Sequence, residues 1–211
     1  MAPLTDVIPK PMAPYAGTTL IASGIGKIRN RLSSIHVTVG YKKAVLAQHV
    51  IEHGACTVVN TEGHGNAWWL FNTLLSSLNE PIFVLTCDNI VELNFELIEN
   101  EYARLGRPAI MLVPVKPVDG LDGDFITQDN CVVRSIDRNN VTDIYCSGIQ
   151  VINPAKVNQL ASNTEDFYDV WSQLIKLEEV KCSTVYPDQW FTVDTIAQLE
   201  TVNLAFVASK E

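Results

Sequence analysis

The feature that most constrains the fold is an alternation of short apolar runs with stretches of helical periodicity. The runs have the length of strands, and apolar side chains recur at helical spacing between them. The expected strands are 35–39, 56–59, 82–86 (a buried strand) and 109–115, and the expected helices are 42–52, 67–78 and 95–105. Strands that alternate with helices favour βαβ units, so the chain is predicted to adopt an α/β fold with a mostly parallel sheet.

After residue 118 the pattern changes to turns rich in Gly, Asp and Asn. Two strands are expected there, at 132–133 and 144–152, and two helices, at 166–179 and 195–208. A hydrophobic content of 47% in 211 residues is enough for one substantial core. Because no repeat or linker divides the chain, we expect a single domain over residues 1–211.

Charge and cysteine content exclude several classes of protein. A formal net charge of −9 argues against nonspecific nucleic-acid binding, which needs basic patches, but it leaves nucleotide binding open because a metal ion can supply positive charge. The five cysteines are scattered and form no Cys-x-x-Cys pair, which indicates a reducing compartment and no zinc site. The sequence shows neither a leader peptide nor a run of membrane-span length, so we expect a cytoplasmic protein.

The most distinctive local motif places Lys10 between Pro9 and Pro11. Proline fixes its own φ and biases the preceding residue toward extended geometry, so Lys10 is expected outside any helix, on a stiff loop. A point positive charge held in this way suits a phosphate or a carboxylate. A surface loop that happens to contain a lysine fits the spacing equally well.

The run Pro3-Leu4-Thr5, followed after a short spacer by Pro9-Lys10-Pro11, resembles the signature of the sugar-phosphate nucleotidylyltransferases. Those enzymes join a nucleoside monophosphate to a phosphorylated sugar or alcohol and release pyrophosphate. The resemblance continues to the C-terminus and implies a Rossmann-like three-layer sandwich with a mostly parallel mixed sheet. It also implies a catalytic role for Lys10 on the phosphates and contacts of Leu4 and Thr5 with the nucleotide.

In that family a β-strand and a Gly-x-Gly-x-Arg loop precede the signature, followed by one hydrophobic residue and one variable residue before Pro-Leu-Thr. Here Met1 falls on the hydrophobic position. Relative to the family, the first strand and the glycine-rich loop are therefore missing. Removing a central parallel strand would leave unpaired backbone groups inside the protein, each costing about 1–3 kcal/mol. We expect that the natural product is longer, with a truncated relative as the alternative.

Two aspartates are candidate ligands of a Mg²⁺ ion. Asp88 follows the expected strand 82–86, and open α/β sheets bind ligands at the carboxyl ends of their strands. Asp194 precedes the expected last helix. Taken alone, either aspartate could equally be a helix N-cap or a turn residue.

The resemblance implies the metal role for both aspartates. Many family members place the second ligand two residues earlier, at the position of Thr192. The sequence Val193-Asp194-Thr195 instead resembles the Ile/Val-Asp-Ser/Thr ending of the phosphocholine cytidylyltransferases, so the role is carried to Asp194.

A glycine-rich turn extends from Asn60 to Asn66 and leads into the expected helix 67–78. Such a turn lets backbone amides approach a ligand, and a helix N-terminus favours negative charge. The resemblance implies that Asn60, Gly65 and Asn66 contact the nucleotide. The alternative is an ordinary turn with Asn66 as N-cap, and His64 is expected to be an exposed turn residue.

Ser147-Gly148-Ile149 lies in the expected strand 144–152 and resembles a family strand that backs the acceptor site. Gly148 is therefore expected near the substrate, although a glycine in a strand can equally mark a bulge. The Glu-Lys-Pro that precedes this strand in hexose-specific members is absent, and Arg138-Asn139-Asn140 stands nearby instead. The absence argues against a standard glucose-type acceptor.

Together these features predict a Mg²⁺-dependent enzyme that transfers a nucleoside monophosphate from a nucleoside triphosphate to a sugar 1-phosphate. The alternatives are a cytidylyltransferase acting on phosphocholine or a similar alcohol, and an inactive relative that binds a nucleotide sugar. The expected partners are a nucleoside triphosphate and a phosphorylated sugar or alcohol, with no nucleic acid and no membrane. The base, the acceptor and assembly into a homo-oligomer stay open.

Overall fold

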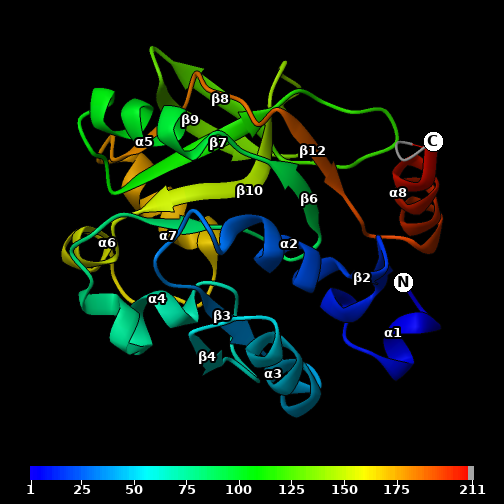
Figure 1. The fold of residues 1–211 in the computed structure, drawn as a ribbon. Coiled ribbons are helices and arrows are strands. Elements are labelled where there is room, and N and C mark those ends of the chain that lie inside the picture. Colours follow the sequence, from blue (N-terminus) through cyan, green and yellow to red (C-terminus); the bar gives the residue numbers. More distant parts are fainter. Residues whose placement is uncertain (209–211) are drawn as a thin grey trace. The chain divides into compact units, whose positions relative to one another are not determined.

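The computed structural model describes residues 1–208 and contains two compact units (Figure 1). The first unit comprises Met1–Gly63, Cys87–Val91 and the chain from Phe191 onward, and the second comprises His64–Thr86 and Glu92–Trp190. The chain passes from one unit to the other several times, so the units are not successive domains. The single domain over residues 1–211 stays a prediction.

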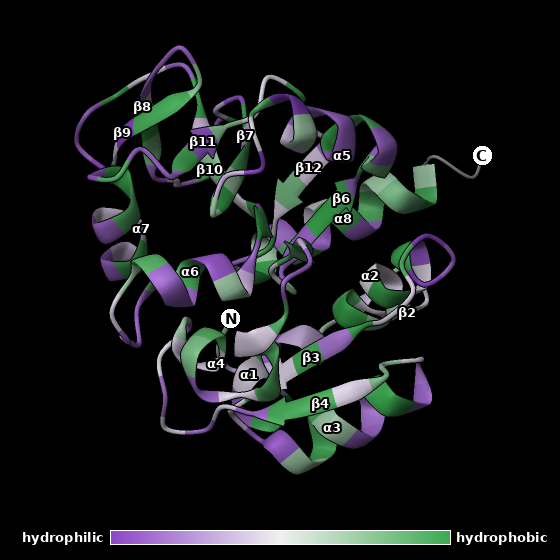
Figure 2. Ribbon diagram, turned by 90° about the vertical axis from the view of Figure 1, so that its left-hand side faces the viewer, coloured by the Kyte–Doolittle hydropathy of each residue, from purple (hydrophilic) through white to green (hydrophobic). Residues whose placement is uncertain are grey.

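The first unit combines short N-terminal elements with a parallel strand pair and a C-terminal helix. Its elements are α1 (Leu4–Val7), the 3-10 helix η1 (Lys10–Met12), β1 (Pro14–Tyr15), β2 (Thr18–Thr19), α2 (Leu20–Ile28), β3 (His36–Val39), α3 (Lys43–Glu52), β4 (Thr57–Asn60) and α8 (Ile196–Ala208). β3 and β4 pair in parallel, and α3 connects them and packs beside them (Figure 2). The paired strands β6 (Asn89–Glu92) and β12 (Gln189–Thr192) each contain residues of both units.

The second unit is built on a six-stranded sheet in the order β5-β10-β7-β11-β9-β8. Its elements are α4 (Trp68–Asn72), the 3-10 helix η2 (Leu74–Ser77), β5 (Ile82–Val84), α5 (Phe95–Arg104), β7 (Ile110–Val115), β8 (Phe125–Asp129), β9 (Val132–Asp137), β10 (Tyr145–Ile152), α6 (Pro154–Leu160), α7 (Phe167–Ile175) and β11 (Val180–Cys182). Every residue of β7 is buried, as expected for a strand inside a sheet.

The predicted α/β fold with a mixed sheet is confirmed. β7 and β11 are parallel, whereas β10 runs antiparallel to both β5 and β7, and β9 runs antiparallel to β8 and β11. Antiparallel pairing is thus more extensive than predicted, because side-chain periodicity does not encode the direction of a strand. β5 stands at one end of the strand order and is half-buried, whereas the sequence predicted a buried strand.

The prediction that Lys10 lies outside any helix is wrong, because Lys10 is the first residue of η1. Pro9 is extended, with φ −60° and ψ 143°, and Pro11 occupies the second position of the turn. A proline is tolerated there because the first N–H groups of a helix have no intrahelical acceptor.

Two expected helices are shorter than predicted. The helix 67–78 is interrupted at Thr73, whose extended backbone separates α4 from η2 and whose hydroxyl bonds to Trp69 O and Leu75 N. α7 ends at Ile175, and Glu178 at φ +58° then closes a Schellman motif. The sequence carries no glycine at that position to announce the end of the helix.

Two apolar clusters form the core of the first unit. One packs α2 against β3 and α3, through Ile21, Ile25, Ile35, Val39, Leu46 and Val50. The other joins all three segments of the unit, through Ala13, Tyr15, Leu20, Ile90, Val193, Leu199 and Val202. The second cluster therefore holds together the three chain segments that carry Lys10, Asp88 and Asp194. None of the helices within residues 1–208 has the length and apolarity needed to cross a membrane.

Candidate functional site

Three predicted site residues meet in the first unit. The Lys10 Nζ atom donates to Asp88 Oδ2 at 2.7 Å and to Asp194 Oδ1 at 2.6 Å. The two aspartates are 78 and 184 residues from Lys10 along the chain. The fold of this unit therefore brings one amine and two carboxylates into a single cluster.

Buried neighbours in the chain hold each member of this cluster. Ala13 ends the turn that begins at Lys10, and Ile90 and Val193 lie beside the aspartates; all three belong to the same apolar cluster. The backbones of the two acidic segments are also joined, because Val193 N donates to Asp88 O at 3.0 Å. The charged side chains thus project from a packed apolar base.

Neither aspartate is used as a helix cap. Asp88 precedes strand β6, and the start of α8 is held by Thr195 and Gln198 in a capping box. The Gln198 side chain also accepts from Asp194 N at 2.7 Å. The Asp194 carboxylate takes no part in this cap: one oxygen accepts from Lys10, and the other accepts from Thr192 Oγ1 at 3.3 Å.

The electrostatics of the cluster favour a charged amine. Burial alone would lower the pKa of Lys10, but hydrogen bonds and opposite charges from Asp194 and Asp88 outweigh it and raise the pKa above its usual value. Beside them, burial and the Asp88 charge raise the pKa of the Cys87 thiol to about 12, so this thiol stays protonated. The side chains of Lys10, Asp88 and Asp194 are 27%, 24% and 54% exposed, which leaves the cluster accessible to a ligand.

The donor set suits a magnesium ion that is shared with a substrate. Mg²⁺ is usually bound by one or two carboxylates together with phosphate oxygens and water. Asp88 and Asp194 supply the two carboxylates. Within the described chain no three His, Cys, Asp or Glu residues cluster into a metal site built from protein alone. The Mg²⁺ role stays a prediction.

The remaining predicted nucleotide residues of the first unit lie on two segments. Leu4 and Thr5 begin α1, where Leu4 packs against the cluster that contains Ala13. Asn60 ends β4, is exposed, and accepts from Glu62 N at 3.1 Å. Their contact with a nucleotide stays a prediction.

Gly65 and Asn66 lie in the second unit and hold the segment before α7. Gly65 N donates to Glu165 Oε2 at 3.0 Å, and a Cβ atom on Gly65 would lie 2.1 Å from Glu165 O. Asn66 Oδ1 accepts from Phe167 N at 3.0 Å. Asn66 is therefore not the N-cap of α4, which was the alternative, and the glycine is needed for close packing of two backbones.

His64, expected to be an exposed turn residue, has two close neighbours. Its Nδ1 lies 3.1 Å from Glu165 Oε1, and its ring stacks on Trp68 with centroids 4.0 Å apart. Its side chain is 38% exposed. Glu165 thus organises this turn through both its backbone and its carboxylate.

Gly148 lies at a bulge in β10. Its φ is +77°, and the register between β10 and β7 shifts between Cys146 and Ile149. Ser147 Oγ donates to Val113 O, and Ser147 O accepts from Trp190 Nε1 at 3.0 Å. The bulge accounts for the glycine, and a substrate contact stays a prediction.

Sequence reasoning missed the residues that support these sites. The spacing of Thr195 and Gln198 is the signature of a capping box and could have been recognised. Glu165 has no local signal, because its partners lie about 100 residues away.

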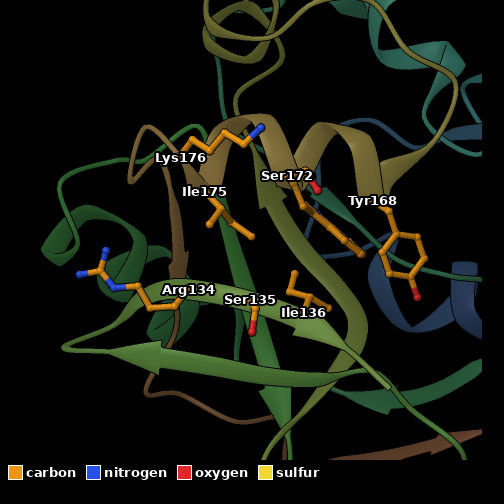
Figure 3. A pocket seen from close by; sticks show the side chains of 8 residues that line it. Arg134, Ser135, Ile136, Tyr168, Ser172, Ile175 and Lys176 are labelled. Atoms are coloured by element: carbon orange, nitrogen blue, oxygen red, sulfur yellow. The ribbon is translucent and has the colours of Figure 1, made fainter. Parts of the chain in front are cut away.

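A separate cavity of about 300 Å³ lies in the second unit between α7 and β9 (Figure 3). It is lined by Arg134, Ser135, Ile136, Tyr168, Trp171, Ser172, Ile175 and Lys176, none of which is a predicted site residue. The Arg134 guanidinium is already paired with Glu178 at 2.7 Å.

Comparison with known proteins identifies the fold. No protein-family model and no curated relative matches the sequence. The inositol-1-phosphate CTP transferase of T. maritima superposes with a TM-score of 0.76 at 20% identity, covering 98% of this chain and 91% of that one. The CTP:phosphocholine cytidylyltransferase of Streptococcus pneumoniae superposes with a TM-score of 0.72 at 17% identity, covering 97% and 92%.

A third similar structure comes from Bacillus anthracis and is described as a glucose-1-phosphate thymidylyltransferase in complex with sucrose. It superposes with a TM-score of 0.76 at 13% identity, covering 98% of this chain and 89% of that one. Together with the Pro3-Leu4-Thr5 and Pro9-Lys10-Pro11 motifs, these likenesses show that the chain has the fold of the sugar-phosphate nucleotidyltransferases.

Proposed function

We propose that this chain is a nucleotidyltransferase that transfers a nucleoside monophosphate from a nucleoside triphosphate to a sugar 1-phosphate. Pyrophosphate is released and a nucleoside-diphosphate sugar is formed. The observation that carries the proposal is the cluster of Lys10, Asp88 and Asp194 in a chain with this fold. An amine beside two carboxylates is suited to nucleotidyl transfer, because catalysis of such reactions rests mainly on positioning the reactants and neutralising the charge of the phosphates.

In this reaction an oxygen of the acceptor phosphate attacks the α-phosphorus, and pyrophosphate leaves on the opposite side. Lys10 places positive charge against the phosphates. The buried, extended Pro9 restricts the backbone direction from which the Lys10 side chain projects. Asp88 and Asp194 would hold Mg²⁺, which would supply charge neutralisation on the α-phosphate and the acceptor phosphate. No covalent intermediate with the protein is needed.

A second candidate is a cytidylyltransferase that acts on phosphocholine or a similar phosphorylated alcohol. Val193-Asp194-Thr195 favours it, because this ending resembles that branch. Two of the similar structures also bear names with CTP and a phosphorylated alcohol as substrates, inositol 1-phosphate in one and phosphocholine in the other. An inactive relative that binds a nucleotide sugar is the remaining alternative.

A pyrophosphate-release screen tests the proposal. The four ribonucleoside triphosphates and thymidine triphosphate are each combined with sugar 1-phosphates, inositol 1-phosphate and phosphocholine, with magnesium or with EDTA. Magnesium-dependent release with a sugar 1-phosphate supports the proposal, and release only with CTP and an alcohol phosphate supports the second candidate. Absence of release with every pair, together with binding of a nucleotide sugar, would support the inactive relative and overturn both.

A further inference from the structure

A side chain from the start of α3 holds the end of α1. Lys42 Nζ donates to Asp6 O at 2.6 Å and to Val7 O at 2.5 Å. No N–H group within a helix donates to the carbonyl groups at its C-terminus, so these groups need donors from elsewhere. The single amine of Lys42 is the partner of both carbonyl groups, from 36 and 35 residues away in the sequence.

These two carbonyl groups lie four and three residues before Lys10, at the exposed end of α1. Val7 is 74% exposed and Asp6 is also exposed, so neither side chain fixes the backbone by packing. Only Ile8 and the buried Pro9 separate them from Lys10. Leu4 and Pro9 hold the two ends of this stretch by packing, and the two bonds from Lys42 hold the exposed peptide groups of Asp6 and Val7 between them.

Lys42 is itself held in an unusual backbone conformation. Its φ of 50° and ψ of 40° are left-handed, a region that residues other than glycine seldom occupy and that persists where the surrounding structure enforces it. Lys42 O accepts from Leu46 N at 3.3 Å, and Leu46 is buried in the core of the unit. The amine also lies 5.3 Å from the centre of the Tyr41 ring.

We propose that Lys42 is a positioning residue for Lys10. It anchors the end of α1 to the base of α3, and so sets where the Lys10 amine lies relative to Asp88 and Asp194. The inference rests on the proposed function and adds to it a residue that acts through Lys10. Lys43 provides a contrast, because its amine pairs with Glu62 at 2.6 Å and makes no bond to α1.

The first test compares Lys42→Met with the matched control Lys43→Met, which removes the same charge from the neighbouring position. Small displacements of a catalytic group are costly, so Lys42→Met is expected to lower kcat/KM for pyrophosphate release roughly 10- to 100-fold. The control is expected to change it less than about 3-fold. Lys42→Arg, which keeps several N–H donors, is expected to restore activity to within about 5-fold of the native protein.

A double-mutant cycle distinguishes positioning from an independent effect. If Lys42 acts through Lys10, Lys42→Met in a Lys10→Met background should change activity less than about 3-fold, because the two effects are not additive. Two effects that simply multiply would overturn the proposal.

A chemical measurement tests the same idea without enzymatic activity. The native protein, Lys42→Met and Lys43→Met are treated with a small acylating reagent, and modification of Lys10 is followed by peptide mass spectrometry. Lys10 should be acylated several-fold faster in Lys42→Met alone, because its contacts with the carboxylates are loosened. Equal rates in all three proteins would overturn the proposal. A faster rate in Lys42→Met, combined with a native protein that releases no pyrophosphate, would support the positioning role and refute the proposed function.

Discussion

Replacing Lys10 by methionine should separate two consequences of its position between Asp88 and Asp194. In the native protein the amine bonds to both carboxylates, at 2.7 and 2.6 Å, so a divalent cation must compete with its positive charge for the same two carboxylates. Methionine keeps an unbranched side chain but removes the charge. We expect Lys10→Met to bind a divalent cation more tightly when no nucleotide is present, and yet to be a much poorer enzyme.

The structure sets the magnitude of this effect. The three side chains are 27%, 24% and 54% exposed, so each ion pair is valued as a solvent-screened one, up to about 1 kcal/mol. Removing both pairs therefore favours cation binding by about 1–2 kcal/mol, which corresponds to roughly 5- to 30-fold in affinity. The lost interaction with the phosphates should lower pyrophosphate release by about 100-fold or more.

Titration with Mn²⁺, followed by electron paramagnetic resonance, measures the affinity directly. Lys43→Met is the control, because it removes the same charge from a lysine that pairs with Glu62. Unchanged or weaker Mn²⁺ binding by Lys10→Met, at a level close to that of the control, would refute the view that the two carboxylates form a cation site.

Three further perturbations test other parts of the account. Asp88→Asn and Asp194→Asn should each lower magnesium-dependent pyrophosphate release by about 100-fold or more, and a loss of only a few-fold would count against the metal role. Gly65→Ala should lower the free energy of unfolding by roughly 1–3 kcal/mol, because its Cβ would lie 2.1 Å from a backbone oxygen. Gly24→Ala, in α2 with nothing within 4 Å, should be neutral or stabilising, and equal denaturation midpoints for the two variants would contradict this reasoning. The Arg104 guanidinium, which donates to Glu101, helps to lower the pKa of Glu101 to about 2. The stability that this carboxylate contributes should therefore be complete above about pH 4.5 and lost as the pH falls toward 2. In Glu101→Gln, the loss of unfolding free energy between about pH 4.5 and pH 2, measured by chemical denaturation, should be smaller by about 3 kcal/mol. An unchanged loss would show that the carboxylate is not its cause.

The elements that the sequence predicted well are those with a clear period. β7 and α5 agree with their predicted ranges to within one residue, because an apolar run marks the strand and an amphipathic face marks the helix. The predicted range of α3 is equally accurate, although its apolar residues do not gather on one face and Val45 and Ile51 are exposed. Short strands such as β11, three residues long, carry no period and were not predicted. The end of α7 was also missed, because Glu178 takes the left-handed position that glycine usually announces.

The candidate site was predictable in part. Lys10, Asp88 and Asp194 were recognised from local motifs and from the family resemblance, and the fold of the first unit brings them together. The partners that hold the site were not, because contacts such as Lys42 with Asp6 depend on tertiary structure rather than on any nearby pattern.

The most direct test of the central claim is a crystal structure with Mn²⁺ and a non-hydrolysable nucleoside triphosphate. Anomalous scattering locates the metal without ambiguity. We predict a peak bonded to carboxylate oxygens of Asp88 and Asp194, with the Lys10 amine on a phosphate oxygen of the nucleotide. A nucleotide and a metal bound away from these three residues would contradict the account.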